Sequence, residues 1–131
     1  TLGHTTHTAL RANVTTISSL SDCRDKTEIQ PISVGLCFVK DLNPVQFKWD
    51  RRDKTMTDVK EIGFIAQELD EVQQKHNIED HLNIVLKSNP DRLEASPGKL
   101  IPILVKAIQE LTKKEEWFLT NSVITAKLKA R

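Results

Sequence analysis

The sequence predicts an α+β fold: a small globular part with short strands and helices, followed by a long C-terminal helix. Val45, Phe47 and Trp49 alternate with polar residues, which is the pattern of a half-buried strand. From Ile101 onward, apolar residues recur at intervals of three and four, which is typical of an amphipathic helix. The 131 residues, 38% of them apolar, fit one domain with a modest core.

Residues 1–20 differ in composition from the rest of the chain. They are rich in threonine, which favours extended structure, and they contain no acidic residue. From Ser21 onward the chain changes to amphipathic segments with alternating charge. This break predicts a module boundary, with residues 1–20 on one side and residues 21–131 on the other.

Helical and extended segments are expected to alternate between residues 29 and 87. Ile32, Leu36 and Val39 share a helical stripe that begins near residue 29. The helix must stop before Pro44, because the residue that precedes a proline avoids the α region. Beyond the strand at residues 45–49, the pattern predicts a charged loop or hairpin tip over 51–60, a helix over 62–75, a short strand over 83–87 and a turn over 88–91.

The final section is expected to form a long helix that begins at Ser96-Pro97-Gly98, with serine as its N-cap and proline in its first turn. An apolar stripe on this helix has the 3-4-3 spacing of a coiled-coil seam: Ile101, Leu104, Ile108 and Leu111. A single amphipathic helix that packs on its own domain would have the same spacing. Beyond the stripe the heptad fails, and Asn121-Ser122 is expected to break the helix.

Charge and residue usage argue against several classes of function. The net charge is +1 and the basic residues are spread along the chain, whereas nucleic-acid and anionic-membrane surfaces need a clustered basic face. No apolar run reaches the roughly 18–20 residues of a membrane span. The four histidines lack the further ligands that a zinc ion needs, so neither a metal nor a cofactor is predicted. The two cysteines are expected to be free thiols.

A serine and a lysine stand close together in the sequence at the composition break. Ser21 needs a nearby base to attack a carbonyl group at neutral pH, and a short loop can bring Lys26 to it. Between them, Arg24 can stabilise an oxyanion or orient Asp22. The alternative is an ordinary helix start, with Ser21 or Asp22 as the N-cap and both basic side chains in solvent. Spacing alone leaves both interpretations open.

Several motifs follow one another from this point. They are S-D-x-R-x-K-x-x-I at residues 21–29, G-L at 35–36, L-x-P-V-x-F-x-W at 42–49, I-G-F-I-A-Q-E-L at 62–69 and L-I-P-I-L-V-K-A-I-Q-E-L at 100–111. In this order, the region from Ser21 to about Leu111 resembles the endosialidase-type C-terminal intramolecular chaperone domain of bacteriophage tail spikes, tail fibres and neck appendages. Residues 1–20 are similar to the end of the fibre module that precedes this domain.

The resemblance implies a domain that cuts itself off its own chain. The implied cleavage site is Leu20–Ser21, with Ser21 as the nucleophile and Lys26 as its base. Asp22 and Arg24 match the motif, and we expect them to position the peptide. Gln67 either lines the same site or is an ordinary polar residue of its helix.

The resemblance also implies a homotrimer that is held together by the seam of the final helix. Its folding client is the upstream fibre or spike segment of the same polypeptide, and it needs no nucleic acid, membrane or cofactor. Such a domain acts in the host cytoplasm during phage assembly and is absent from the mature virion after cleavage.

Two other functions compete with this one. The first is a trimerisation module of a structural protein that never cleaves. The second is a Ser–Lys hydrolase that acts on external substrates, and the small domain without a G-x-S-x-G elbow argues against it.

Overall fold

A computed structural model describes residues 9–130, and the chain divides into two compact units between Gln30 and Pro31. In the described part of the first unit, the only regular element is a short 3-10 helix, Cys23–Asp25. Residues 9–20 form no strand despite their threonine content, and residues 1–8 lie outside the described range. The apolar side chains of Ile17 and Leu20 are exposed.

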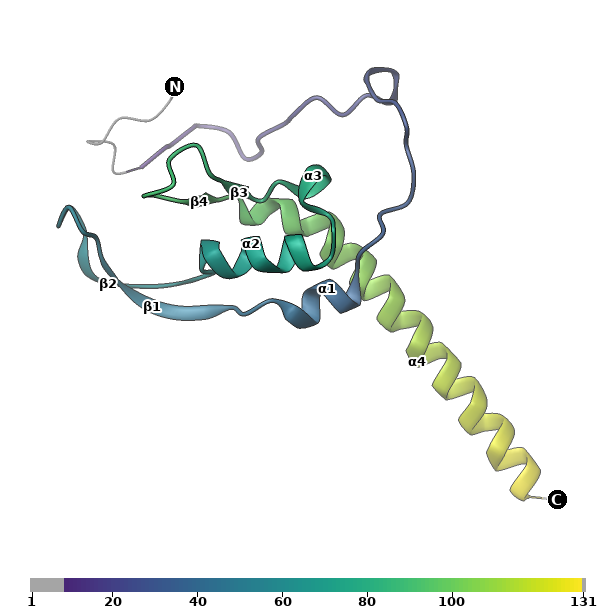
Figure 1. Cartoon of the computed structure of the whole chain (residues 1–131). Helices are drawn as coiled ribbons and strands as arrows, with labels where there is room; N and C mark the ends of the chain where they lie inside the picture. Colours follow the sequence, from purple (N-terminus) through teal and green to yellow (C-terminus); the bar gives the residue numbers. More distant parts are fainter. Residues whose placement is uncertain (1–8, 131) are drawn as a thin grey trace. The chain divides into compact units, whose positions relative to one another are not determined.

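The second unit combines short helices with two hairpins and ends in a long helix (Figure 1). Its elements in chain order are α1 (Leu36–Asp41), β1 (Val45–Asp50), β2 (Thr57–Gly63), α2 (Ala66–Lys75), α3 (Glu79–Leu82), β3 (Val85–Leu86), β4 (Glu94–Ala95) and α4 (Ile101–Lys129). Each sheet is one antiparallel pair, β1 with β2 and β3 with β4. The predicted α+β fold with a long C-terminal helix is confirmed.

The β1–β2 hairpin confirms the strand that the alternating pattern predicted. Val45, Phe47 and Trp49 are half-buried and the residues between them are exposed. The rings of Phe47 and Trp49 meet edge to face, with 5.1 Å between their centroids. The charged loop is shorter than predicted, because residues from Thr57 onward already pair with β1.

Two helices begin later than the sequence predicted. α1 starts at Leu36 and not near residue 29, because Gly35 has a non-helical backbone, with φ −157° and ψ −113°. It ends at Asp41, ahead of Asn43-Pro44, as predicted. α2 starts at Ala66 and not at residue 62, because residues 62 and 63 belong to β2.

The core of the second unit contains side chains from α1, α2, α3, β3 and the first turns of α4. Phe38, Ile84 and Ile103 are at most 1% exposed. One polar residue, Gln73, is also fully buried. Its Oε1 accepts a hydrogen bond from the Ile84 N–H at 3.1 Å, and its Nε2 donates to Asp70 Oδ1 at 2.8 Å. Both ends of the buried amide are therefore satisfied.

α4 is a continuous helix of 29 residues. A 3-10 turn, Pro97–Leu100, leads into it, and Ser96 precedes the turn as its N-cap residue without a side-chain bond. The predicted break at Asn121-Ser122 is wrong. The Asn121 side chain instead donates to the carbonyl of Trp117 at 2.8 Å, one turn earlier in the same helix. Within residues 9–130, no helix combines the length and the apolar character that a membrane crossing requires.

Candidate functional site

The side chains of Ser21 and Lys26 meet in the first unit. Lys26 Nζ donates a hydrogen bond to Ser21 Oγ at 2.8 Å. The 3-10 helix between them reverses the chain, since the Asp25 N–H bonds to the Asp22 carbonyl and the Lys26 N–H bonds to the Cys23 carbonyl. Both members of the pair are exposed in the single chain. The loop thus brings a hydroxyl and an amine together without help from a buried core.

Asp22 and Arg24 form further bonds within the same loop. The Asp22 carboxylate caps the 3-10 helix by accepting from the Arg24 N–H at 2.9 Å. It also accepts from the Arg24 guanidinium, with 2.7 Å between Nη2 and Oδ2 and 3.1 Å between Nε and Oδ1. The guanidinium lowers the pKa of the Asp22 carboxyl. Capping by Asp22 and pairing of Ser21 with Lys26 therefore occur together in one loop.

Gln67 is distant from this loop in the sequence and belongs to the other unit. It occupies the first turn of α2, in the second unit, and its side chain is exposed. On the same turn, the neighbouring Glu68 accepts a hydrogen bond from Asn43 Nδ2 at 3.2 Å.

α4 has two faces with different surroundings. Ile103 and Ala107 are buried in the second unit, where α1 packs against α4. The seam residues are exposed instead, at 63% for Ile101, 41% for Leu104, 64% for Ile108 and 54% for Leu111. The helix therefore packs on its own domain through one face and also presents an apolar seam on another.

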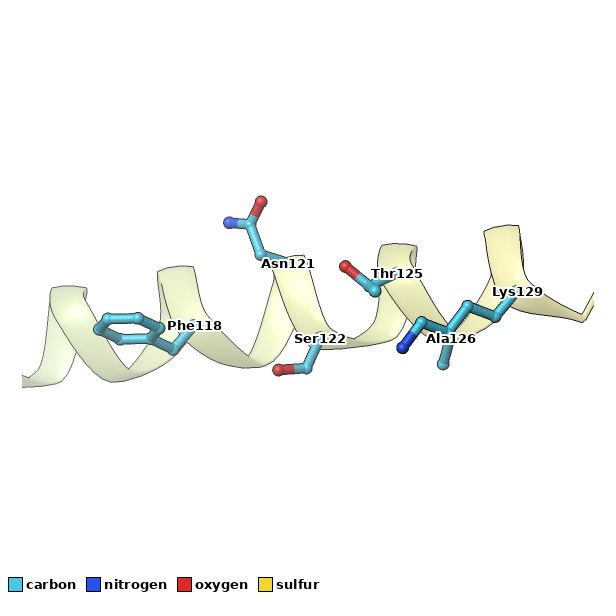
Figure 2. A pocket seen from close by; sticks show the side chains of 6 residues that line it. All are labelled: Phe118, Asn121, Ser122, Thr125, Ala126 and Lys129. Carbon is cyan, nitrogen blue, oxygen red and sulfur yellow. The ribbon is translucent and has the colours of Figure 1, made fainter.

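A shallow hollow of about 380 Å³ lies along the last turns of α4 (Figure 2). Its lining comes from this one helix: Phe118, Asn121, Ser122, Thr125, Ala126 and Lys129. Residues 118, 122, 125 and 129 continue the seam spacing of three and four. One helix face cannot enclose a small molecule, so the hollow is not a ligand site. No group of three or more candidate metal ligands occurs among residues 9–130.

Sequence reasoning missed the side chains that hold α1 at its two ends. At the first turn, Glu110 Oε2 of α4 accepts from the Leu36 N–H at 3.1 Å. At the last residue, Asp41 Oδ2 lies 2.7 Å from His76 Nε2 and 3.0 Å from Lys75 Nζ. These partners are far apart in the sequence, so no local pattern could have indicated them.

Comparison with known protein families identifies the chain. The Peptidase_S74 family model, chaperone of endosialidase, matches residues 21–87, which is just over half of the chain. The match begins at Ser21, the residue that bonds to Lys26. No curated protein and no solved structure matches the chain. The chain belongs to the Peptidase_S74 family of endosialidase chaperones, self-cleaving intramolecular chaperones that act on the domain to which they are fused.

Proposed function

We propose that three copies of this chain assemble through α4, guide the folding of an upstream phage tail spike or fibre segment, and then cut the Leu20–Ser21 bond. The observation that carries the proposal is the 2.8 Å contact between Lys26 Nζ and Ser21 Oγ. It joins a nucleophile and a candidate base at the residue where the family match begins. The domain would act in the host cytoplasm during assembly and be absent from the mature virion.

Ser21 acts as nucleophile on the peptide bond that precedes it. Lys26, as a neutral amine, accepts the hydroxyl proton while Oγ attacks the Leu20 carbonyl carbon. The C–N bond breaks, the proton passes to the Ser21 nitrogen, and an ester joins Leu20 to Ser21 Oγ. Water then hydrolyses the ester, which leaves a carboxylate on Leu20 and a free amine and hydroxyl on Ser21.

The exposure of Lys26 indicates when this reaction can start. A lysine serves as a base when its surroundings exclude water and disfavour the ammonium form. Lys26 is exposed in the single chain, where its Nζ donates to Ser21 Oγ. We propose that assembly and the folded upstream segment cover the loop, so that cleavage follows folding. The Asp22–Arg24 pair keeps the loop in the required conformation until then.

The exposed seam of α4 supports assembly of several copies. Ile101, Leu104, Ile108 and Leu111 form one apolar stripe that the single chain leaves largely in water. We expect Ile108→Asp to yield a monomer by analytical ultracentrifugation, because burying a carboxylate in the seam is unfavourable. Lys113→Asp, an exposed residue off the stripe, is the matched control and should keep the trimer mass. A trimeric Ile108→Asp protein would exclude this seam as the interface.

The role of Ser21 is tested in a chain that carries an upstream fibre segment. Ser21→Ala removes the nucleophile, so a denaturing gel should show one uncut band while the native trimer mass persists. Ser21→Cys supplies another nucleophile and should retain slow cutting. The mature fragment of the unmodified chain should begin at Ser21 in N-terminal sequencing. Full processing of the Ser21→Ala chain would remove Ser21 from the reaction.

The role of Lys26 needs a variant that keeps the charge and loses the base. Lys26→Arg preserves a donor for Ser21 Oγ, but a guanidinium cannot be deprotonated in a protein. We expect both Lys26→Arg and Lys26→Ala to form trimers that cut at least about a hundredfold more slowly than the unmodified chain. Normal cutting by Lys26→Arg would show that the lysine is a structural donor and not the base.

A non-cleaving trimerisation module is the second candidate function. The exposure of Ser21 and Lys26 in the single chain favours it, because no buried environment surrounds the lysine there. The mass of the unmodified chain, measured after prolonged folding with its upstream segment, separates the two functions. An intact trimer supports the module, and a fragment that begins at Ser21 supports self-cleavage.

A further inference from the structure

Glu110 ties the helix that carries the seam to the first turn of α1. Its Oε2 accepts a hydrogen bond from the Leu36 N–H at 3.1 Å. This N–H belongs to the first turn of a helix, where backbone donors have no partner within the helix itself. Gly35, the residue before the helix, offers no side-chain cap. A carboxylate from α4 therefore supplies the cap that the local sequence lacks.

Gly35 leaves the space that this carboxylate occupies. A Cβ at position 35 would lie 2.5 Å from Glu110 Oε1 and 2.9 Å from Lys106 Cγ. Such distances are too short for any side chain, so an alanine would displace either the carboxylate or the backbone of α1. The glycine and the glutamate, distant in sequence, form one joint between α1 and α4.

α1 is also fixed at its other end and in its middle. Asp41, its last residue, pairs with His76 and Lys75 at the end of α2. The Phe38 ring is fully buried in the core and lies at 5.3 Å from the His76 ring. α1 is therefore held at three points, by α4 at its start, by the core in its middle and by α2 at its end. The start of α1 is therefore a fixed point in the chain, five residues after the second unit begins at Pro31.

The chain that precedes this point comes directly from the proposed cleavage loop. Residues 27–34 connect Lys26 to Gly35, and Val34 in this connection is buried. On α4, Glu110 lies beside the seam residues Ile108 and Leu111 in sequence but is directed to α1. Ile103 and Ala107 already fix the rotation of α4 on the second unit, and packing of the seam would hold that rotation in the trimer. That rotation sets the position of the Glu110 carboxylate.

We propose that Glu110 is a positioning residue for self-cleavage, which transmits assembly at the α4 seam through α1 to the segment that carries Ser21 and Lys26. This inference rests on the proposed function. Glu110 touches no reacting atom; its bond to the start of α1 is present in the single chain, and packing of the seam would hold it in the trimer. Loss of the joint should therefore slow cutting without preventing assembly.

The test compares cleavage rates and trimer mass in chains that carry the upstream segment. Glu110→Ala should form a trimer that cuts about ten- to a hundredfold more slowly, the size of effect that misplacement away from the chemistry produces. Glu110→Gln keeps the acceptor oxygen and should restore most of the rate. Gly35→Ala should match Glu110→Ala, and combining the two should add little, because both remove the same joint. Ile103→Val, which weakens packing on the same helix, is the control for simple loss of stability and should cut normally.

Several outcomes overturn the inference. One is a trimeric Glu110→Ala chain that cuts at the unmodified rate. Another is an Ile103→Val chain that is slowed as much as Glu110→Ala when the two have a similar melting temperature. If Glu110→Ala does not assemble, Glu110→Asp decides: about tenfold slower cutting by a trimer supports the inference, and normal cutting contradicts it. If the unmodified chain never cuts, the proposed function fails. Hydrogen exchange of the Leu36 amide in the Ser21→Ala trimer then tests the joint, because Glu110→Ala should speed exchange and an unchanged rate would refute it.

Discussion

The described residues of the two units differ in what they contribute. Residues 9–30 contain the Ser21–Lys26 contact and the Asp22–Arg24 pair. Their side chains are exposed, except that Asp22 is half-buried. Residues 31–130 contain the hydrophobic core, both hairpins and the exposed seam of α4. The candidate reactive residues and the hydrophobic core therefore lie in separate parts of the chain.

This separation teaches that the loop need not depend on the core for its shape. The hydrogen bonds that shape the loop join residues 21–26 to one another. Its geometry is local, and the core can change without altering those bonds. The free energy of unfolding and the rate of cutting should therefore respond to different substitutions.

The largest expected effect follows from truncating the centre of the core. Phe38 is fully buried, so Phe38→Ala should lower the free energy of unfolding by about 3–5 kcal/mol. Urea denaturation at a fixed chain concentration measures this, since assembly makes stability concentration-dependent. Phe47→Ala, on the half-buried face of the hairpin, is the control and should cost clearly less. Equal losses for the two variants would contradict the position of the core.

A smaller loss is expected where the core contains its polar residue. Gln73→Met conserves volume but leaves the buried Ile84 N–H without an acceptor, which should cost about 1–3 kcal/mol. The neighbouring Gln74 is exposed, and Gln74→Met should stay within about 0.5 kcal/mol of the unmodified chain. Urea midpoints give both values. A neutral Gln73→Met would mean that the buried amide contributes no specific bond.

Acid should weaken the contact between α1 and α2. His76 and Lys75, through their hydrogen bonds, lower the pKa of the Asp41 carboxyl in the folded chain. A lowered folded pKa means that this stabilisation is complete above the unfolded pKa, about 3.9, and is lost as the pH falls through the folded value. The difference in urea midpoint between the unmodified chain and Asp41→Asn should therefore shrink below about pH 4. A difference that stays constant into strong acid would exclude this role for Asp41.

The smallest effect on stability is expected in the loop of Ser21 and Lys26. Arg24 is exposed, and its pair with Asp22 lies at the surface, so Arg24→Ala should leave the urea midpoint unchanged. The same variant should slow cutting, because the 3-10 helix that brings Ser21 to Lys26 loses its lock. Arg11→Ala, another exposed arginine of the first unit, should change neither quantity. Equal cutting rates for both variants would show that Arg24 is not needed to hold the 3-10 helix in shape.

Local sequence patterns predicted those elements that local forces determine. The alternation at residues 45–49 and the spacing from Ile101 were sufficient for β1 and for α4, because each pattern matches the period of its element. Residues 57–63 pair with β1, which a local pattern does not indicate. Because of this pairing, the loop before them and the helix after them are shorter than predicted. The break assigned to Asn121 failed because its side chain bonds within the helix.

The candidate site divides in the same way. Ser21 and Lys26 lie within one turn, so their spacing alone indicated that they could meet, and they do at 2.8 Å. The joint of Gly35 with Glu110 needs the packing of α1 on α4 before the two residues come near each other. Nothing in the sequence around Gly35 or Glu110 indicates that the glutamate caps the helix that begins after the glycine. Contacts of this kind are determined by tertiary packing, which no short window of sequence contains.

The Ser21–Lys26 contact is local, so both residues would stay on the same side of the proposed cut. If the Leu20–Ser21 bond is the one that breaks, both members of the pair remain with the released domain, which keeps its reactive groups and loses its substrate. Each polypeptide would then supply one catalyst for one event. Under the proposed function, the timing of the cut would be the last control point in the assembly of the upstream segment, and the released domain would take no further part.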